Sequence, residues 1–492
     1  MKIELTRKQI DGIARAANAV VGRACRLPVL EHLHFSVMSP DRLDVTAADL
    51  EQRLTVTVVP DTAASPGECL VPLGELKALK KTLGRSGTVT IGTKSEEELV
   101  FVTATGAGCF ERTVGTLPVD EFPLPADPPA MKEADTAGFL TAYRRAAASA
   151  STDATRGALV GVYADPKAEA LVGTDGRRLA RLPLDDFPFE SDAILPVTKA
   201  LLKRIPASGP GMIGLADRGH EQVFAIRTDD LQYTCKCLDG PFPAYDRVIP
   251  DDLDRFRTTL TFGEADADAL KTLLPHVKNE ENRPVFLAGR NGAVAAGIDT
   301  DANGASALVL PGCRFDRGAE LAVAVNGTFL ESALRSGFRV LRVKDRLTPL
   351  CFNGDNGGLH LVMPLRNEPP EALSARLDSV LKETADNASS VNVRASTAAT
   401  PAAPKASGKT DRATAATSAA SDASDPVARL DELVTESREA IRAARTSVTE
   451  LGKQVRAVKA HYRNREKEIR SREKEMEKNL ALISRLQESM AA

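Results

Sequence analysis

The feature that most constrains this chain is an internal repeat within its first 366 residues. Six times, a short β-like run precedes a helix with one apolar face, and strands of alternating polarity follow. The expected helices span residues 6–20, 73–83, 136–150, 196–205, 264–278 and 327–336. One such unit cannot enclose a core, so units are expected to pair. The repeat therefore predicts an α+β fold of three similar domains, each a pair of β-α-β-β-β units.

The composition sets the expected boundaries. The three domains are predicted at 1–125, 130–251 and 257–366. Residues 367–426 are rich in Ala, Ser, Thr and Pro and poor in large apolar side chains, which is typical of a disordered linker. Residues 427–490 carry an aliphatic, Met or Tyr side chain every seventh position from Val434 to Met490, which predicts a long coiled-coil helix.

Several functional classes are excluded by what the sequence lacks. The seven cysteines are scattered without a C-x-x-C pair, which favours reduced buried thiols in a cytoplasmic protein and no metal site. No apolar run is long enough for a membrane span, and no secretory signal opens the chain. No catalytic Ser, Cys or His constellation and no complete nucleotide-binding loop is present, so we expect no enzyme and no cofactor.

Positive charge is concentrated in the expected helices. Residues 1–370 carry a net charge of −6, yet the six helices hold 14 basic and six acidic side chains. Such segregation suits a surface that meets DNA phosphates without reading sequence, although an isolated amphipathic helix often has a solvated charged face. The cations expected to face DNA are Arg7, Arg15, Arg23, Lys77, Lys80, Lys81, Arg144, Arg145, Lys199 and Lys203.

Motifs in all three expected domains resemble those of one bacterial family. They include Leu27-Pro28-Val29-Leu30, Thr116-Leu117-Pro118-Val119-Asp120-Glu121-Phe122-Pro123, Thr174-Asp175-Gly176-Arg177-Arg178-Leu179-Ala180 and Leu361-Val362-Met363-Pro364-Leu365-Arg366. In this order and at these spacings the chain resembles the DNA polymerase III beta subunit, the sliding clamp, from residue 1 to residue 366. The tail is not part of the resemblance.

The resemblance implies that two chains join head to tail into a ring, with helices lining a hole for duplex DNA. It also implies a pocket for short peptides of the replicative polymerase and clamp loader. Carried over by matching motif, that pocket comprises Leu159, Thr174, Gly176, Arg177, Arg178, Leu179, Pro243, Arg247, Val248, Leu361, Met363, Pro364 and Leu365. Two departures stand out, because Arg177 stands where the family usually has His or another less charged residue, and Asp266 and Asp268 are expected near the hole.

The functional hypothesis is therefore a homodimeric processivity clamp that encircles duplex DNA and tethers the polymerase and other clamp-binding proteins without catalysis. The alternative is a scaffold or adaptor that kept the fold and the peptide pocket but does not encircle DNA. In the tail, a basic stretch between Leu451 and Lys474 leaves two interpretations open. Either the coiled coil binds itself or a partner, or the basic stretch contacts DNA.

Overall fold

A computed structural model describes residues 1–396, apart from 23–26, 85–86, 106–107, 124–127, 208–209, 220, 279–281, 291, 301–303 and 319. The predicted coiled coil at 427–490 and the predicted DNA-facing Arg23 lie outside the described residues.

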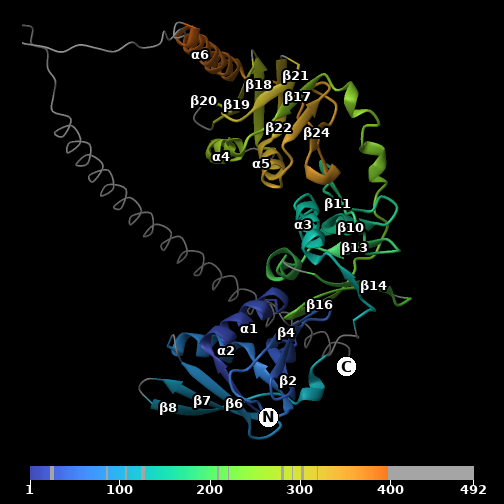
Figure 1. Ribbon diagram of the computed structural model, residues 1–492, viewed down its shortest axis with the longest axis vertical. Coiled ribbons are helices and arrows are strands. Elements are labelled where there is room, and N and C mark those ends of the chain that lie inside the picture. Colours follow the sequence, from blue (N-terminus) through green and yellow to red (C-terminus); the bar gives the residue numbers. More distant parts are fainter. Residues whose placement is uncertain are drawn as a thin grey trace, which may run out of the picture. The chain divides into compact units, whose positions relative to one another are not determined.

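Three pairs of helices lie within the described body (Figure 1). The pairs are α1 (Arg7–Val20) with α2 (Leu73–Thr82), α3 (Thr136–Ala147) with the π-helical turn η4 (Ala200–Arg204), and α4 (Glu264–Leu273) with α5 (Gly327–Arg335). Each follows one of the six leading strands that the repeat predicts. The sixfold unit is thus confirmed.

Two of the helices are much shorter than the sequence predicts, each by five residues. The expected helix at 196–205 is reduced to η4, because Pro196 still belongs to β13 and the helical turn starts only at Ala200, while Pro206 disfavours a helical Ile205 at the other end. The expected helix at 264–278 ends as α4 at Leu273, where Pro275 lacks an N–H and a 3-10 turn (Leu274–His276) follows.

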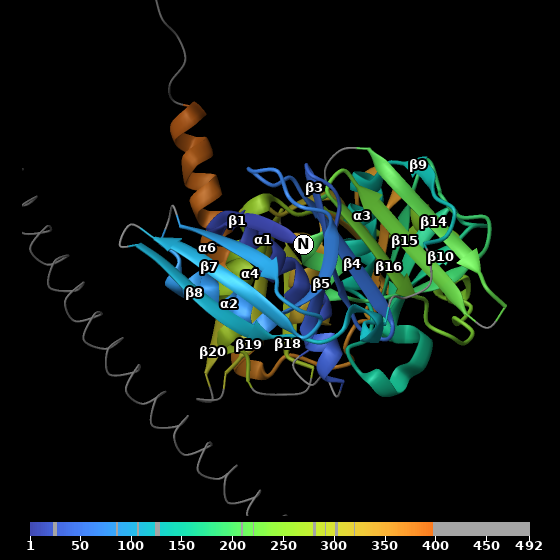
Figure 2. The same cartoon turned by 90° about the horizontal axis from the view of Figure 1, so that it is seen from below.

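The strands form four antiparallel sheets. The first is β1 (Lys2–Thr6), β6 (Thr88–Thr93), β7 (Glu98–Thr105) and β8 (Gly108–Gly115), which lie side by side in Figure 2. The last is β20 (Ala305–Val309), β19 (Ala293–Asp299), β18 (Pro284–Arg290) and β22 (Glu320–Asn326).

Two longer sheets connect successive parts of the body. The eight-stranded sheet runs in the order β5 (Gly67–Pro72), β2 (His32–Ser39), β3 (Arg42–Ala48), β4 (Gln52–Val58), β16 (Leu231–Lys236), β15 (Gln222–Thr228), β14 (Gly211–Asp217) and β9 (Lys132–Ala134). The nine-stranded sheet runs in the order β13 (Ala193–Pro196), β10 (Gly161–Asp165), β11 (Ala170–Thr174), β12 (Arg178–Pro183), β25 (Leu359–Val362), β24 (Leu350–Asn353), β23 (Val340–Val343), β17 (Thr258–Thr261) and β21 (Arg314–Arg317).

Paired units exchange their leading strands. β1 precedes α1 but pairs with β6, which follows α2, whereas β5 precedes α2 and pairs with β2, which follows α1. The same exchange joins β9 to β14, β13 to β10, β17 to β23 and β22 to β18. A single unit therefore lacks one strand of its own sheet, which explains why the units occur in pairs.

Each of the six helices of the repeat contributes a fully buried Leu or Ile to the main core. These residues are Ile10, Leu76, Leu140, Leu201, Leu270 and Leu330, each 0 % exposed. Their recurrence once per unit shows that the sequence repeat arises from one repeated packing problem, a helix on the inner face of two sheets.

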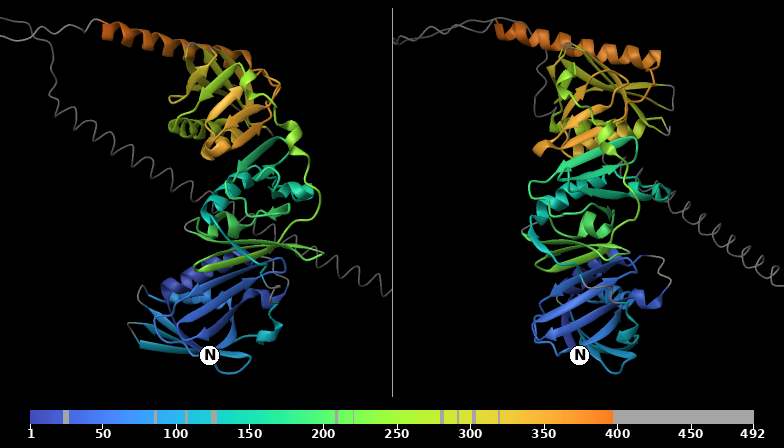
Figure 3. Two further views of the ribbon diagram at one scale, coloured as in Figure 1. Left: turned by 45° about the vertical axis from the view of Figure 1, so that its right-hand side comes forward. Right: turned by 90° about the vertical axis from the view of Figure 1, so that its right-hand side faces the viewer.

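Part of the predicted disordered linker is a helix. α6 (Glu371–Ser396) occupies residues that the sequence analysis assigned to the linker, and Figure 3 shows its first half against the last sheet. The prediction of disorder was wrong there because Leu373, Leu377, Val380 and Leu381 form an apolar stripe at helical spacing, and all four are buried.

Among the described residues, no helix is both long and apolar enough to cross a membrane, and no group of three potential metal ligands occurs.

Candidate functional site

The first helix pair exposes a set of cations. Buried faces of α1 and α2 leave Lys8, Arg15, Lys77 and Lys81 exposed on the opposite side, with Lys80 half-buried. Because the helix period fixes which positions face away from the core, these ammonium and guanidinium groups occupy one accessible surface. Arg7 is half-buried at the start of α1.

One carboxylate lies among these cations. The Asp11 side chain forms an ion pair with Lys80 and another with Arg15, whose Nη2 atom is 3.1 Å from Asp11 Oδ2. The hydrogen bond from Lys80, and secondarily the charges of Arg15 and Arg7, lower the pKa of Asp11. Two of the predicted DNA-facing cations therefore already have a local counter-charge.

The arginines of the second pair contact other parts of the protein. Arg144 donates from Nε to the Leu201 carbonyl oxygen at 3.0 Å and from Nη2 to that of Ile205 at 2.5 Å, so it closes the end of η4. Burial lowers the pKa of its guanidinium. The Arg145 guanidinium lies 4.5 Å above the centre of the Phe338 ring, in the segment after α5. Each arginine is thus engaged by the protein itself, and the expectation that both face DNA stays a prediction.

The remaining cations of η4 divide by role. Lys199 and Lys203 are exposed, as predicted for DNA-facing groups. Arg204 instead donates to the Gly12 carbonyl oxygen of α1 at 3.3 Å, and its pKa is lowered by burial and by the charge of Arg15. The short π-helical turn thus joins α1 to α3 while presenting two lysines.

The expected acidic pair of α4 separates in the structure. Asp266 is fully buried and accepts hydrogen bonds from the backbone N–H groups of Gly263 at 2.8 Å and Gly312 at 2.9 Å. It caps the helix from a buried position, and its placement near a hole stays a prediction. Asp268 is exposed.

The predicted peptide pocket centres on the turn between β11 and β12. Gly176 adopts a φ of +82°, and its N–H donates to Thr174 Oγ1 at 3.1 Å. Asp175 accepts from the backbone N–H groups of Arg177 and Arg178 and pairs with Arg178 Nε at 2.9 Å. The motif is therefore a tightly hydrogen-bonded turn whose geometry requires the glycine.

This turn lies beside the end of the body. β12 pairs with β25, placing Leu179 opposite Leu361, and the Met363 N–H donates to the Arg177 carbonyl oxygen at 2.9 Å. The Arg178 guanidinium lies 4.4 Å above the Phe329 ring of α5. The Thr174–Leu179 and Leu361–Leu365 members of the predicted pocket are thus brought together from distant parts of the sequence.

Other predicted members lie on neighbouring segments. Arg247 and Val248 are exposed on the 3-10 turn Tyr245–Val248, and Leu159 is half-buried. Pro243 lines a separate groove of about 610 Å³ with Tyr163, whose ring stacks on Phe242 at 4.7 Å. The sequence analysis missed Phe329 and Asn282. Asn282 Oδ1 accepts from Arg177 Nη1 at 3.0 Å, and no local pattern could have predicted that contact.

Val248 and Met363 expose apolar surface near this turn. Their exposed fractions are 54 % and 46 %. Exposed large apolar residues beside a rigid turn are a common feature of peptide-binding surfaces.

The fold is that of a clamp-like protein built from six repeated units, and comparison with known proteins agrees. No protein-family model matches the chain. The beta sliding clamp of Pseudomonas aeruginosa is 33 % identical over 240 residues, covering 47 % of this chain and 63 % of the relative. That of Caulobacter vibrioides is 27 % identical over 314 residues, covering 60 % and 80 %. The chain thus spans just under two thirds of the P. aeruginosa relative.

Solved structures show the same fold. The DNA polymerase III subunit beta of P. aeruginosa superposes with a TM-score of 0.62 at 23 % identity, covering 74 % of this chain and all of that one. The beta subunit of Streptococcus pyogenes gives 0.63 at 16 % identity, with 75 % and 100 % coverage. The chain is therefore similar to bacterial beta sliding clamps in sequence, and the larger part of it has their fold.

Proposed function

We propose that this protein is a DNA sliding clamp, a non-catalytic cytoplasmic processivity factor whose two copies close head to tail around duplex DNA. The predicted limits of its three domains, 1–125, 130–251 and 257–366, are part of the proposal. One observation carries it, namely the way in which the repeated units join. The sequence similarity to beta sliding clamps supports it.

Within the chain, units join by one rule. The last strand of the first unit, β4, pairs with β16 of the fourth, and β12 of the third pairs with β25 of the sixth, both antiparallel. The first unit of one pair thus always joins the second unit of the next pair. By this rule the fifth unit, which is the first of its pair, should join the second unit of another pair. Within the described part of the chain, the second unit is also left without such a partner. The last strands of the fifth and second units, β20 and β8, each lie at a sheet edge.

Because β8 and β20 belong to opposite ends of the described body, the rule is completed between two copies. β8 of one chain would continue β20 of the other, making an eight-stranded sheet like the one inside each chain. Phe110, 64 % exposed on β8, would then be covered.

The closing contact can be trapped through a natural cysteine. Cys109 on β8 is exposed, whereas Cys69, Cys235, Cys237, Cys313 and Cys351 are buried. In the full chain with Cys25→Ser, registers like those of β12–β25 and β4–β16 pair residues of the same sheet face, so Cys109 would lie opposite Ala307 or Val309, next to Leu308. A short bis-maleimide should therefore join Cys109 to the cysteine of Leu308→Cys or Ala307→Cys and yield covalent dimers. Cys109→Ser should abolish them.

Encirclement is tested by the same reagent. If the Leu308→Cys variant is cross-linked in the presence of nicked circular plasmid, the closed protein ring should stay on the DNA in detergent. The same ring should come off plasmid that has been linearised. Cross-linked dimers that dissociate in detergent from the circular and the linear plasmid alike would favour the scaffold or adaptor alternative. A dimer held together only by the tail would give no Cys109 cross-link.

The turn at Thr174–Leu179, with Leu361–Leu365 beside it, is proposed as a docking site for short peptides of the polymerase and clamp loader. A solved P. aeruginosa sliding clamp is bound to griselimycin, which provides a probe. Met363→Asp should weaken griselimycin binding measured by calorimetry. Met38→Asp, at a residue 76 % exposed on β2, should not. Equal affinities for both variants would place the docking site elsewhere.

The partner of the tail at 427–490 remains a separate proposal, in which its coiled coil binds itself or another helix.

A further inference from the structure

Helix α6 packs on the outer face of the sheet β20-β19-β18-β22, chiefly over β20 and β19. Along the strands, Val285, Leu287 and Val294 point into the main core, while Phe286, Ala295 and Ala324 belong to a second apolar cluster with the helix. The helix supplies Leu373, Leu377, Val380 and Leu381 to that cluster. This sheet is therefore packed on both faces.

The strands are suited to the helix by their small residues. Gly297 on β19 leaves room for the helix, because a Cβ atom there would come within 2.9 Å of Leu373 Cδ1 and of Leu377 Cδ2. Four further alanines face the same cluster, at positions 288, 293, 305 and 307. The fit between a small-residue sheet face and a leucine-bearing helix indicates a built contact.

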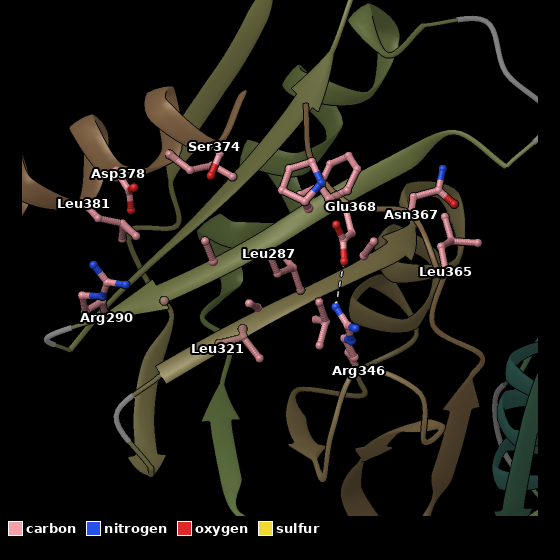
Figure 4. Close-up of a pocket in the computed structure, with 18 of the residues that line it drawn as sticks. Leu287, Arg290, Leu321, Arg346, Leu365, Asn367, Glu368, Ser374, Asp378 and Leu381 are labelled. Atoms are coloured by element: carbon pink, nitrogen blue, oxygen red, sulfur yellow. Dashed lines mark hydrogen bonds and ion pairs between the residues drawn. The ribbon is translucent and has the colours of Figure 1, made fainter. Parts of the chain in front are cut away.

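The helix is not centred on the sheet. It packs mainly on β20 and β19, the two strands at the edge, and hardly touches β18. Beside it, over β18 and β22, a groove of about 700 Å³ stays open, with Leu377 and Leu381 on its helical wall (Figure 4). An ion pair between Arg346 Nη1 and Glu368 Oε1, at 3.0 Å, lies at its rim.

The covered strand is the one that most needs support. β20 has five residues and only one neighbouring strand, β19. A short edge strand frays readily, because half of its backbone groups lack a partner and few side chains hold it. Ala305, Ala307 and Val309 of β20 are held from outside by the α6 cluster.

We propose that α6 is a brace for the edge strand β20, and that pairing of β20 with β8 of a second copy depends on it. The proposal rests on the proposed head-to-tail closure. It assigns a role to residues 371–384, which extend the clamp body beyond the part that resembles the family.

The experiment compares two substitutions on α6 in the full chain carrying Cys25→Ser and Leu308→Cys. Leu377→Asp places a charge in the buried contact, whereas Ala375→Asp makes the same change on the exposed side. The yield of Cys109 cross-linked dimer at a fixed low protein concentration should fall about tenfold for Leu377→Asp and stay at the parent's level for Ala375→Asp.

A second variant and a second measurement separate local from global effects. Gly297→Val pushes on the same contact from the sheet, and should lower the yield in the same direction. Hydrogen exchange followed by mass spectrometry should show lost protection in 371–384 and in β20, but not in β2 or β3. Undiminished cross-linking despite an unprotected α6 would overturn the brace. No cross-link in the parent would overturn the closure, and the brace with it.

Discussion

At the scale of single residues, charge alone does not define a DNA-facing group. The guanidinium groups of Arg144 and Arg204 donate hydrogen bonds to backbone carbonyl oxygens. In contrast, four lysines are exposed, namely Lys77, Lys81, Lys199 and Lys203. The guanidinium donors of these arginines are therefore already used inside the protein, whereas the strongly hydrated lysine ammonium groups stay accessible. The lysines are therefore the more effective candidates for phosphate contact.

Removing those lysines should change the salt dependence of DNA binding. Replacing Lys77, Lys81, Lys199 and Lys203 by Ala should flatten the slope of log affinity against log salt, by up to about 0.9 for each lost phosphate contact. Fluorescence anisotropy with a labelled duplex measures this. Lys132→Ala, at an exposed residue on β9, is the matched control and should leave the slope unchanged.

Arg144→Ala should act on stability instead. Loss of its two hydrogen bonds leaves the Leu201 and Ile205 carbonyl groups without that donor, which should cost about 1–3 kcal/mol of unfolding free energy. Denaturant unfolding measures the loss. A large change in DNA affinity with no change in stability would support Arg144 as a DNA contact.

His360 should make the folded body sensitive to acid. It is buried, with Nδ1 3.4 Å from Ser149 Oγ, and burial together with the charges of Arg178 and Arg145 lowers its pKa from 6.5 to about 3. Between these values the unfolded chain binds a proton that the folded chain does not. The free energy of unfolding should thus fall as pH drops below about 6.5, by up to about 1.4 kcal/mol per pH unit. Denaturant titrations should show that slope in the parent and not in His360→Gln. The control His276→Gln, at an exposed residue, should behave like the parent.

At the scale of elements, the sequence predicted what repeats and missed what does not. Six leading strands and their helices were found because Ile10, Leu140 and Leu330 solve the same packing problem in successive units. The exchange of leading strands was invisible, since pairing partners lie far apart in the chain. α6 was overlooked because the stripe from Leu373 to Leu381 is embedded in an Ala- and Ser-rich stretch that was judged by composition.

The candidate sites followed the same division. The turn at Thr174–Leu179 was found from its motif, and its hydrogen bonds are local in the sequence. Arg145 on Phe338 and Arg178 on Phe329 depend on side chains more than 150 residues away, which no spacing could reveal.

The buried carboxylate that caps α4 gives a test at this scale. Asp266→Ala removes an acceptor from two backbone N–H groups, one in the Gly312 turn, so it should cost about 1–3 kcal/mol of unfolding free energy. Asp268→Ala, two residues along the same helix and exposed, should cost little. Thermal and denaturant unfolding of both variants compares the two directly, and equal losses would mean that the cap is not made in solution.

At the scale of the whole molecule, two sheets continue across the body by pairing the last strands of two units, while β8 and β20 are last strands that lie at sheet edges. The internal junctions are tethered by the chain, so the junction between copies is expected to be the weakest one, and closure and DNA contact should respond differently to salt. Phosphate contacts by exposed lysines weaken steeply as salt rises, because releasing counterions from DNA gains less entropy when the bulk salt concentration is high. A covalently closed ring is retained by topology, which salt does not alter. After cross-linking Leu308→Cys to Cys109 on DNA, raising the salt to about 1 M should strip the protein from linear duplex but leave it on nicked circles. Cutting the retained circles with a restriction enzyme should then release it. Equal loss from circles and linear DNA would mean that the closed dimer binds DNA from outside.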